Sequence, residues 1–283
     1  MRKKTKCALI VATALTLLGI IILTGVMSML HWNLKGLSTE KFETNRYEIT
    51  HAFHSVEIRT GYADVTLRPT LDEKPSVVCH EMQKVKHTVT VEEGVLVIEA
   101  EDTRRWYDHI GIHFDAPSVT VYLPQAALSA LAVVGTTGNV TVEKELVLES
   151  IDVTLTTGSI RFYASATGDI KLSTTTGNLF VEDVRARNIT LSATTGSAML
   201  EDVVAKEALS VTLRTGDVRL DKVDGAELFF KTTTGNVRGS LFSPKTFTAS
   251  QTTGKVQLPE TTGGGKCEIV TTTGSIKIAI DCD

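Results

Sequence analysis

Apolar and polar residues alternate along most of the chain after residue 45, at a spacing of two. This spacing places alternate side chains on one face of a β-strand, so the pattern predicts strands with one buried face. The pattern recurs around eight Thr-Gly pairs between residues 137 and 274, whose glycines follow one another at 19 or 20 residues. A fixed period of about 20 residues is typical of solenoids, in which each repeat stacks on the next.

Each repeat predicts two strands joined at a glycine corner. Residues seven and five positions before each glycine are apolar, and so are residues two and four positions after it, with Gly239 as the exception. The glycine is expected to adopt a positive φ, where a Cβ would cost ~1–2 kcal/mol. The threonine before it is expected to pack like valine while bonding a neighbour. The predicted corner residues are Gly138, Gly158, Gly177, Gly196, Gly216, Gly235, Gly254 and Gly274, with Thr137, Thr157, Thr176, Thr195, Thr215, Thr234, Thr253 and Thr273.

The alternation divides the chain after residue 45 into two parts. Weaker copies of the repeat lie around Gly61 and Gly94, and residues 117–124 form another expected strand. We therefore expect an irregular β region over residues 46–130 and regular repeats over residues 131–283. The fold class is all-β, a parallel β-solenoid-like repeat with rungs of about 20 residues.

The N-terminus has a different pattern. Residues 7–30 carry no charge, and 24 residues of helix extend ~36 Å, enough to cross a hydrocarbon layer of ~30 Å. Four basic residues precede this segment, so residues 1–6 are expected in the cytoplasm and the rest outside the membrane. Residues 31–45 are polar and are expected to form a short stalk. A cleaved signal peptide is the alternative, but its apolar core is shorter, ~7–15 residues.

Charge and cysteine content narrow the classes of function. The chain has a net charge of -4, and the part after residue 30 carries 25 basic against 33 acidic residues, a net of -8. Such a body repels nucleic acid, so we expect no nucleic-acid partner. Four cysteines are too few for a disulfide scaffold, although pairing of Cys267 with Cys282 stays open.

A family resemblance follows from several passages in order. The chain reads VEIRTGYADVTLRP, then VTVEEGVLVIEA, then RRWYDHIGIHFDAPSVTVYLP, and then serial TTG units. This order resembles the bacterial β-strand-repeat domain of unknown function that is named a putative adhesin and called toastrack-like. The resemblance covers most of residues 48–283. It implies a right-handed, membrane-tethered β-solenoid-like domain, in some cases linked to envelope-stress systems, and it supplies no catalytic residues.

An acidic ladder is the first candidate site. Glu182, Glu201 and Asp221 lie five positions after successive glycines, so stacking would align them on the outer surface. Carboxylate ladders can hold calcium, and paired acids cleave polysaccharides in some solenoids. A solvated acidic stripe is the third interpretation.

A second candidate site lies in WYDHIGIH, where His109 and His113 are four residues apart. That spacing binds zinc on a helix, but Gly111 and the following strand argue against a helix here. We expect instead a loop that packs Trp106 and Tyr107 onto the solenoid.

These features favour a non-catalytic binding or scaffold module at the bacterial cell envelope, with no cofactor. Cell-wall polymer, another envelope protein or a second copy are the candidate partners. The last repeat would leave an open C-terminal edge, through which copies could associate. An accessory or sensor role in an envelope-stress system and a glycan-acting solenoid enzyme are the alternatives.

Overall fold

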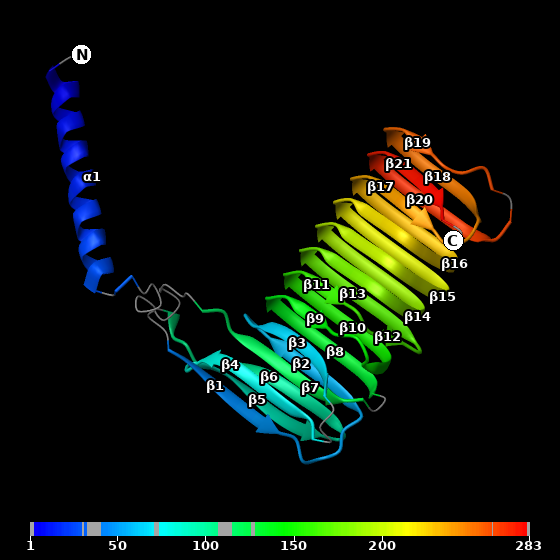
Figure 1. Ribbon diagram of the computed structural model, residues 1–283, viewed down its shortest axis with the longest axis horizontal. Coiled ribbons are helices and arrows are strands. Elements are labelled where there is room, and N and C mark those ends of the chain that lie inside the picture. The colour runs from blue at the N-terminus through cyan, green and yellow to red at the C-terminus, as the bar shows by residue number, and fades with distance from the viewer. Residues whose placement is uncertain are drawn as a thin grey trace. The chain divides into compact units, whose positions relative to one another are not determined.

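The computed structural model describes residues 3–29, 31–32, 41–70, 74–106, 115–125, 128–261 and 263–281. The chain divides into two compact units, one of Met1–Phe42 with Arg104–Ala116 and one of Glu43–Thr103 with Pro117–Asp283. The first unit contains the helix α1 (Lys3–Met29), and the second is built from β-strands (Figure 1).

The strands fall into short and long groups. Three long strands, β14 (Leu179–Thr195), β15 (Ala198–Thr215) and β16 (Val218–Thr234), each span most of a rung. The others are β1 (Phe42–Glu48), β2 (Ser55–Thr60), β3 (Asp64–Thr70), β4 (Ser76–Met82), β5 (Val85–Glu92), β6 (Val95–Asp102), β7 (Ser118–Pro124), β8 (Leu128–Thr137), β9 (Val140–Val142), β10 (Val147–Thr157), β11 (Ile160–Phe162), β12 (Ser165–Ala166), β13 (Asp169–Thr176), β17 (Val237–Leu241), β18 (Lys245–Thr253), β19 (Val256–Gln257), β20 (Gly265–Thr273) and β21 (Ile276–Ile280).

Helix α1 has the length and composition of a membrane-spanning helix. Residues Leu9–Met29 have a mean hydropathy of 2.6, and none of their most apolar window is buried within the protein. The hydroxyls of Thr13 and Thr16 donate to the carbonyls of Leu9 and Ala12 in the preceding turn. These polar groups are therefore satisfied inside the helix, as an apolar surrounding requires.

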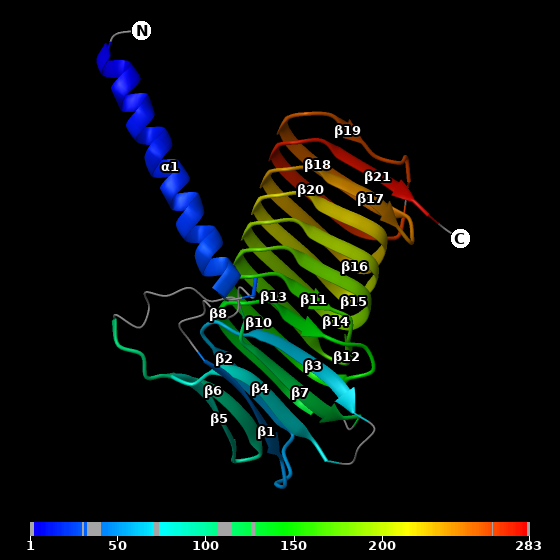
Figure 2. The same ribbon diagram turned by 60° about the vertical axis from the view of Figure 1, so that its left-hand side comes forward.

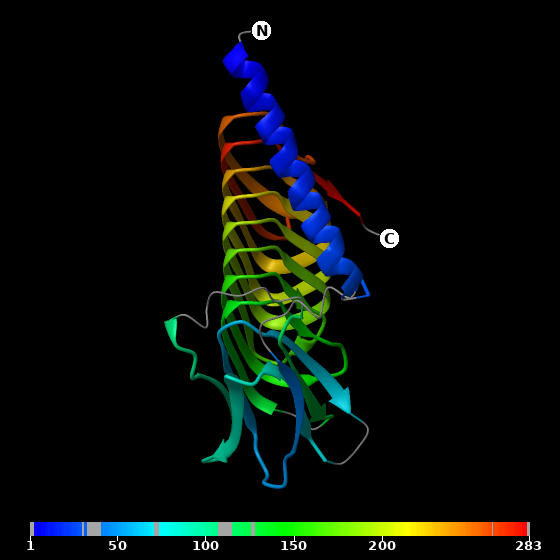
Figure 3. The same ribbon diagram turned by 90° about the vertical axis from the view of Figure 1, so that its left-hand side faces the viewer.

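The middle of the strand unit is a serial parallel stack. Strands β8, β10, β13, β14, β15 and β16 pair in sequence order, each with the next. Equivalent apolar residues align from rung to rung, and all are buried in one continuous core, as for Ile170, Ile189 and Leu209. The predicted all-β solenoid is confirmed, and Figures 2 and 3 show its rungs from two further sides.

Each full rung turns at three places instead of the one corner expected. The first is the glycine, and the second is a non-glycine residue with positive φ, at Asp183, Asp202 and Lys222 in successive rungs. The third is a β-bulge within β14, where the pairing register shifts after Ala186 and the strand bends. A third buried stretch therefore lies between the second and third turns, as in Val184 and Ala186.

The C-terminal end of the stack departs from sequence order. Strand β20 pairs with β16 on one side and with β18 on the other, and β21 lies between β17 and β19 (Figure 1). The expected open edge at the last repeat is therefore wrong for β20 and for the start of β21, which are paired on both sides, whereas residues 278–280 pair with β17 alone. Among the described strands, β18 and β19 form the outer edge of the stack.

The N-terminal end is also out of order. Strands β6 and β7 pair in parallel with β2 and β3, which in turn pair with β8 and β9. The rung around Gly61 thus precedes the first regular rung in space, and β6 with β7 lies beyond it. Strands β4 and β5 add antiparallel pairs, and β1 pairs with β4. Since β1 begins at Phe42, residues 42–45 of the expected stalk are strand.

Candidate functional site

The predicted corner glycines form a column along the solenoid. All eight have positive φ, from 140° at Gly138 to 155° at Gly274. A Cβ at Gly177 would overlap the carbonyl oxygen of Gly158, and the other corner glycines likewise face a corner glycine of the neighbouring rung, except that Gly138 faces the carbonyl oxygen of Ala63. Only glycine fits here, because both the dihedral angle and the close approach of the neighbouring backbone exclude a side chain.

The threonines before these glycines do not behave as expected. All eight side chains are exposed, and the structure gives none of their hydroxyls a hydrogen-bond partner. The expectation that they pack like valine is therefore wrong. Buried threonines occur two positions earlier, where the hydroxyls of Thr174, Thr232 and Thr271 donate to glycine carbonyls. These three hydrogen bonds connect each of the three rungs to the corner glycine of its neighbouring rung.

A second ladder, which was not predicted from the sequence, runs one position after the corner glycines. The side-chain oxygen of each residue in this column accepts the backbone N–H of the equivalent residue in the next rung. The donor and acceptor pairs are Asn139 to Asp64, Ser159 to Asn139, Asn178 to Ser159, Ser197 to Asn178, Asp217 to Ser197, Asn236 to Asp217, Ser275 to Asn236 and Lys255 to Ser275. The outermost rung has Lys255 in this column, because no further described rung needs an acceptor there.

The acidic ladder of the sequence analysis does form. Glu182 pairs in register with Glu201, and Glu201 with Asp221, on three adjacent strands. Among the described residues, however, these carboxylates do not belong to any group of three metal-binding side chains whose ligand atoms lie within 4.8 Å of one another. The neighbouring acids have partners of their own, since Asp183 pairs with Lys144 and Asp202 with Arg185. The geometry therefore favours a solvated stripe over a closed calcium cage.

An open groove of about 410 Å³ lies on the outer surface of the middle rungs, on strands β13 to β16. Hydroxyls line most of it, and two cations lie at one end, Arg214 and Lys231, both exposed and without an ion pair in the structure. Lys231 pairs in register with Thr212 of the rung before. The remaining lining includes Ser173, Thr175, Ser192, Thr194 and Thr233. This groove offers hydroxyl donors at the strand spacing of ~4.8 Å beside two positive charges.

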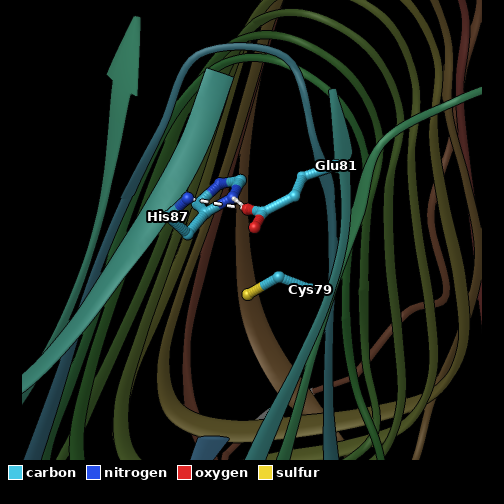
Figure 4. Close-up of side chains that lie close together, drawn as sticks. All are labelled: Cys79, Glu81 and His87. Atoms are coloured by element: carbon cyan, nitrogen blue, oxygen red, sulfur yellow. Dashed lines mark hydrogen bonds and ion pairs between the residues drawn. The ribbon is translucent and has the colours of Figure 1, made fainter. Parts of the chain in front are cut away.

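A buried cluster of three chemically active side chains lies in the N-terminal part of the strand unit (Figure 4). Cys79 and Glu81 lie two residues apart on β4, so they point to the same face, and His87 on β5 faces them. Glu81 and Cys79 are 0% exposed and His87 is 3% exposed. Burial, together with the nearby charge of Glu81, raises the pKa of the Cys79 thiol to about 12.

The hydrogen bonds of this cluster are specific. Oε2 of Glu81 accepts the backbone N–H of His87 at 2.7 Å and lies 2.8 Å from its Nδ1. Oε1 of Glu81 accepts Nδ2 of Asn45 at 2.7 Å, and Nε2 of His87 lies 3.2 Å from Oγ1 of Thr60. The candidate pair His109 and His113 lies outside the described residues, as does Tyr107. Trp106 is 77% exposed, and the expected packing of the loop that contains it onto the solenoid stays a prediction.

Comparison with known proteins agrees with this architecture. The sequence profile of the Toastrack DUF4097 family matches residues 53–283. The chain belongs to this family. No curated protein matches it.

Solved structures similar to this Toastrack chain include two described as putative adhesins. That from Bacteroides fragilis is 12% identical with a TM-score of 0.51, covering 85% of this chain and 97% of its own. That from Parabacteroides distasonis is 12% identical with a TM-score of 0.48, covering 85% and 98%. A structure from the same organism described as a putative lipid binding protein is 14% identical with a TM-score of 0.46, covering 86% and 98%. At such identities the first of these supports the fold alone.

Two features of this Toastrack chain differ in how far its sequence reveals them. The polar ladder was visible, because Asn, Ser or Asp follows seven of the eight glycines and Lys255 alone departs from them. The cluster of Cys79, Glu81 and His87 was hidden, because it depends on a hairpin in the irregular part of the chain. No spacing rule connects a strand cysteine with a histidine across such a turn.

Proposed function

We propose that this protein is a non-catalytic binding and scaffold module of the bacterial cell envelope. Helix α1 anchors it in the cell membrane, with residues 1–6 in the cytoplasm and the solenoid outside. The four basic residues before the apolar segment support this orientation through the positive-inside rule. The family match and the similar structure described as a putative adhesin support a binding role.

The groove on β13 to β16 is the observation that carries the proposal. Arg214 and Lys231 line this groove and have no ion pair in the structure. They are exposed positive charges in a part of the chain, after residue 30, whose net charge is -8. Guanidinium and ammonium groups bind phosphate and carboxylate oxygens, and the surrounding hydroxyls donate hydrogen bonds to the same class of acceptor. The ligand we propose is an anionic cell-wall polymer that carries phosphate or carboxylate groups along its length.

Binding of the purified full chain in detergent to cell-wall polymer tests the proposal. The probes are bacterial cell walls and the same walls stripped of their anionic polymer. We expect binding to intact walls only, and weakening as salt rises, because the contact depends on exposed charges. Replacing both cations, as R214Q/K231Q, is expected to raise Kd about tenfold, since each exposed charge contact contributes on the order of 1 kcal/mol or less.

The matched control is R219Q/K277Q. Both residues are exposed cations on the same solenoid, but they follow the corner glycines and do not line the groove. We expect this variant to bind like the unmodified protein. An equal loss of binding in both double variants would show that net charge alone attracts the wall, and would refute the groove as the binding site. Equal binding to intact and stripped walls would refute an anionic polymer as the ligand.

A further inference from the structure

The cluster of Cys79, Glu81 and His87 combines the three side-chain types that bind zinc in proteins. Thiolate sulfur, imidazole nitrogen and carboxylate oxygen are all zinc ligands, and their ligand atoms here lie within 4.8 Å of one another. All three side chains are almost fully buried in a part of the protein whose other core residues are mostly aliphatic. Buried ionisable groups in such surroundings are normally paired or bound to a metal.

The hydrogen bonds around the cluster are arranged like those that orient the ligands of a bound metal ion. Thr60 holds Nε2 of His87, so Nδ1 is the ring nitrogen that faces the other two side chains. Asn45 holds Oε1 of Glu81, so Oε2 is the oxygen that faces Nδ1. Ligating histidines and carboxylates commonly have their other polar atom bound in this way, because the outer contact fixes the direction of the ligand atom.

The Glu81 and His87 pair does not involve the third side chain, which differs from the other buried free thiol, Cys267, in lying beside a carboxylate and an imidazole. Cys79 lies on the same face of β4 as Glu81 and is a buried free thiol. A divalent cation bound to one thiolate, one carboxylate and one neutral imidazole leaves no net charge. That balance matters in a dry site, where an uncompensated charge is strongly destabilising.

We propose that Cys79, Glu81 and His87 form a structural zinc site that links strands β4 and β5. Zinc takes the place of the proton shared by Nδ1 of His87 and Oε2 of Glu81, and the Cys79 thiol loses its proton on binding. The three side chains supply three of the four positions of a tetrahedral zinc site, a water molecule takes the fourth, and the burial of all three keeps the site closed to a substrate. The metal would therefore stabilise the hairpin and its contacts with β1 and β2.

Cobalt(II) is a suitable probe, because thiolate-bound tetrahedral cobalt absorbs in the near ultraviolet and the visible. The full chain is unfolded, freed of metal, and refolded in detergent with cobalt(II) or zinc(II), since a closed site takes up metal as it folds. We expect about one metal per chain after removal of free ion, a thiolate charge-transfer band with cobalt, and a higher melting temperature with zinc.

Two serine variants separate this site from unspecific thiol binding. C79S is expected to lose the charge-transfer band and the zinc-dependent rise in melting temperature. C267S is the matched control, because Cys267 is also a buried free thiol, 1% exposed, whose pKa burial likewise raises to about 12. It is expected to keep both. Absence of metal from the folded unmodified protein would overturn the proposal, and so would a charge-transfer band that survives in C79S.

Discussion

The backbone N–H of Gly235 donates to the carbonyl oxygen of Thr273 at 2.9 Å, although Thr253 precedes Thr273 in the chain. The backbone N–H of Gly274 in turn donates to the carbonyl oxygen of Thr253 at 2.9 Å. The last described rung is therefore inserted between its two predecessors. Its strands satisfy backbone groups on both sides, which makes it an interior rung in spite of its place in the sequence.

The corner column predicts that Gly274→Ala is strongly destabilising. The new Cβ would overlap the carbonyl oxygen of Gly235, and alanine at a φ of 155° is strained. We expect a loss of at least about 3 kcal/mol in the free energy of unfolding, measured by denaturant titration. Gly61→Ala is the control, since no atom lies within 4 Å of a Cβ there, and its effect should stay within about 1 kcal/mol. Equal effects would contradict the close approach of the corner glycines.

The polar ladder predicts a difference between two positions of one column. Asn236→Ala removes the acceptor for the N–H of Ser275 and the donor to Asp217. We expect a loss of about 1–2 kcal/mol in the free energy of unfolding, because the half-buried N–H loses its partner. Lys255→Ala in the outermost rung should change stability by less than about 0.5 kcal/mol. Thermal unfolding of both variants measures the difference, and a larger effect at Lys255 would rule out this account of the ladder.

The acidic ladder predicts that one charge removal stabilises the protein. Glu201 pairs with Glu182 on one side and Asp221 on the other, and like charges on adjacent strands repel. Glu201→Gln should raise the free energy of unfolding by about 0.5 kcal/mol, with no dependence on millimolar calcium. Glu260→Gln, an exposed acid away from the ladder, is the control. A calcium-dependent rise in melting temperature that Glu201→Gln abolishes would instead establish an ion site.

The ion pair of Lys245 and Asp224 predicts a dependence on pH. Nζ of Lys245, whose side chain is 5% exposed, lies 2.6 Å from Oδ1 of Asp224. Burial raises the pKa of Asp224, but hydrogen bonds from Lys245, Gly225 and Ser243 outweigh it and hold that pKa below its ordinary value. A lowered pKa in the folded state stabilises the protein above the unfolded pKa of about 4, and this contribution is lost as pH falls.

The test compares the unmodified protein with Asp224→Asn over a range of pH. Near neutral pH the variant should be less stable by up to about 3 kcal/mol, because Lys245 keeps a buried charge without its partner. The gap between the two proteins should shrink as pH falls from about 5 to 2. A gap of constant size over that range would show that the carboxylate charge contributes nothing.

The regular repeats were predictable from sequence, because their strands pair with the next strand in the chain. Every rung has the same local requirements, namely alternating buried residues such as Ile170 and Leu172 and a corner glycine such as Gly177. The two ends were not predictable in the same way, since any rung offers the same backbone donors to any other. Lys255 is the residue that distinguishes the outer rung in the sequence. Its position there can be recognised only from the folded structure, in which its N–H donates to Ser275.

The inserted rung also constrains how such a chain can lengthen in evolution. Tandem duplication within β13 to β16 adds a rung between rungs that already follow sequence order. A repeat added after β21 would instead leave from a strand whose first residues, Ile276 and Lys277, lie between β17 and β19, and it would have to pass β19 before it could stack on the outer rung. New copies are therefore accommodated most easily in the middle of the gene.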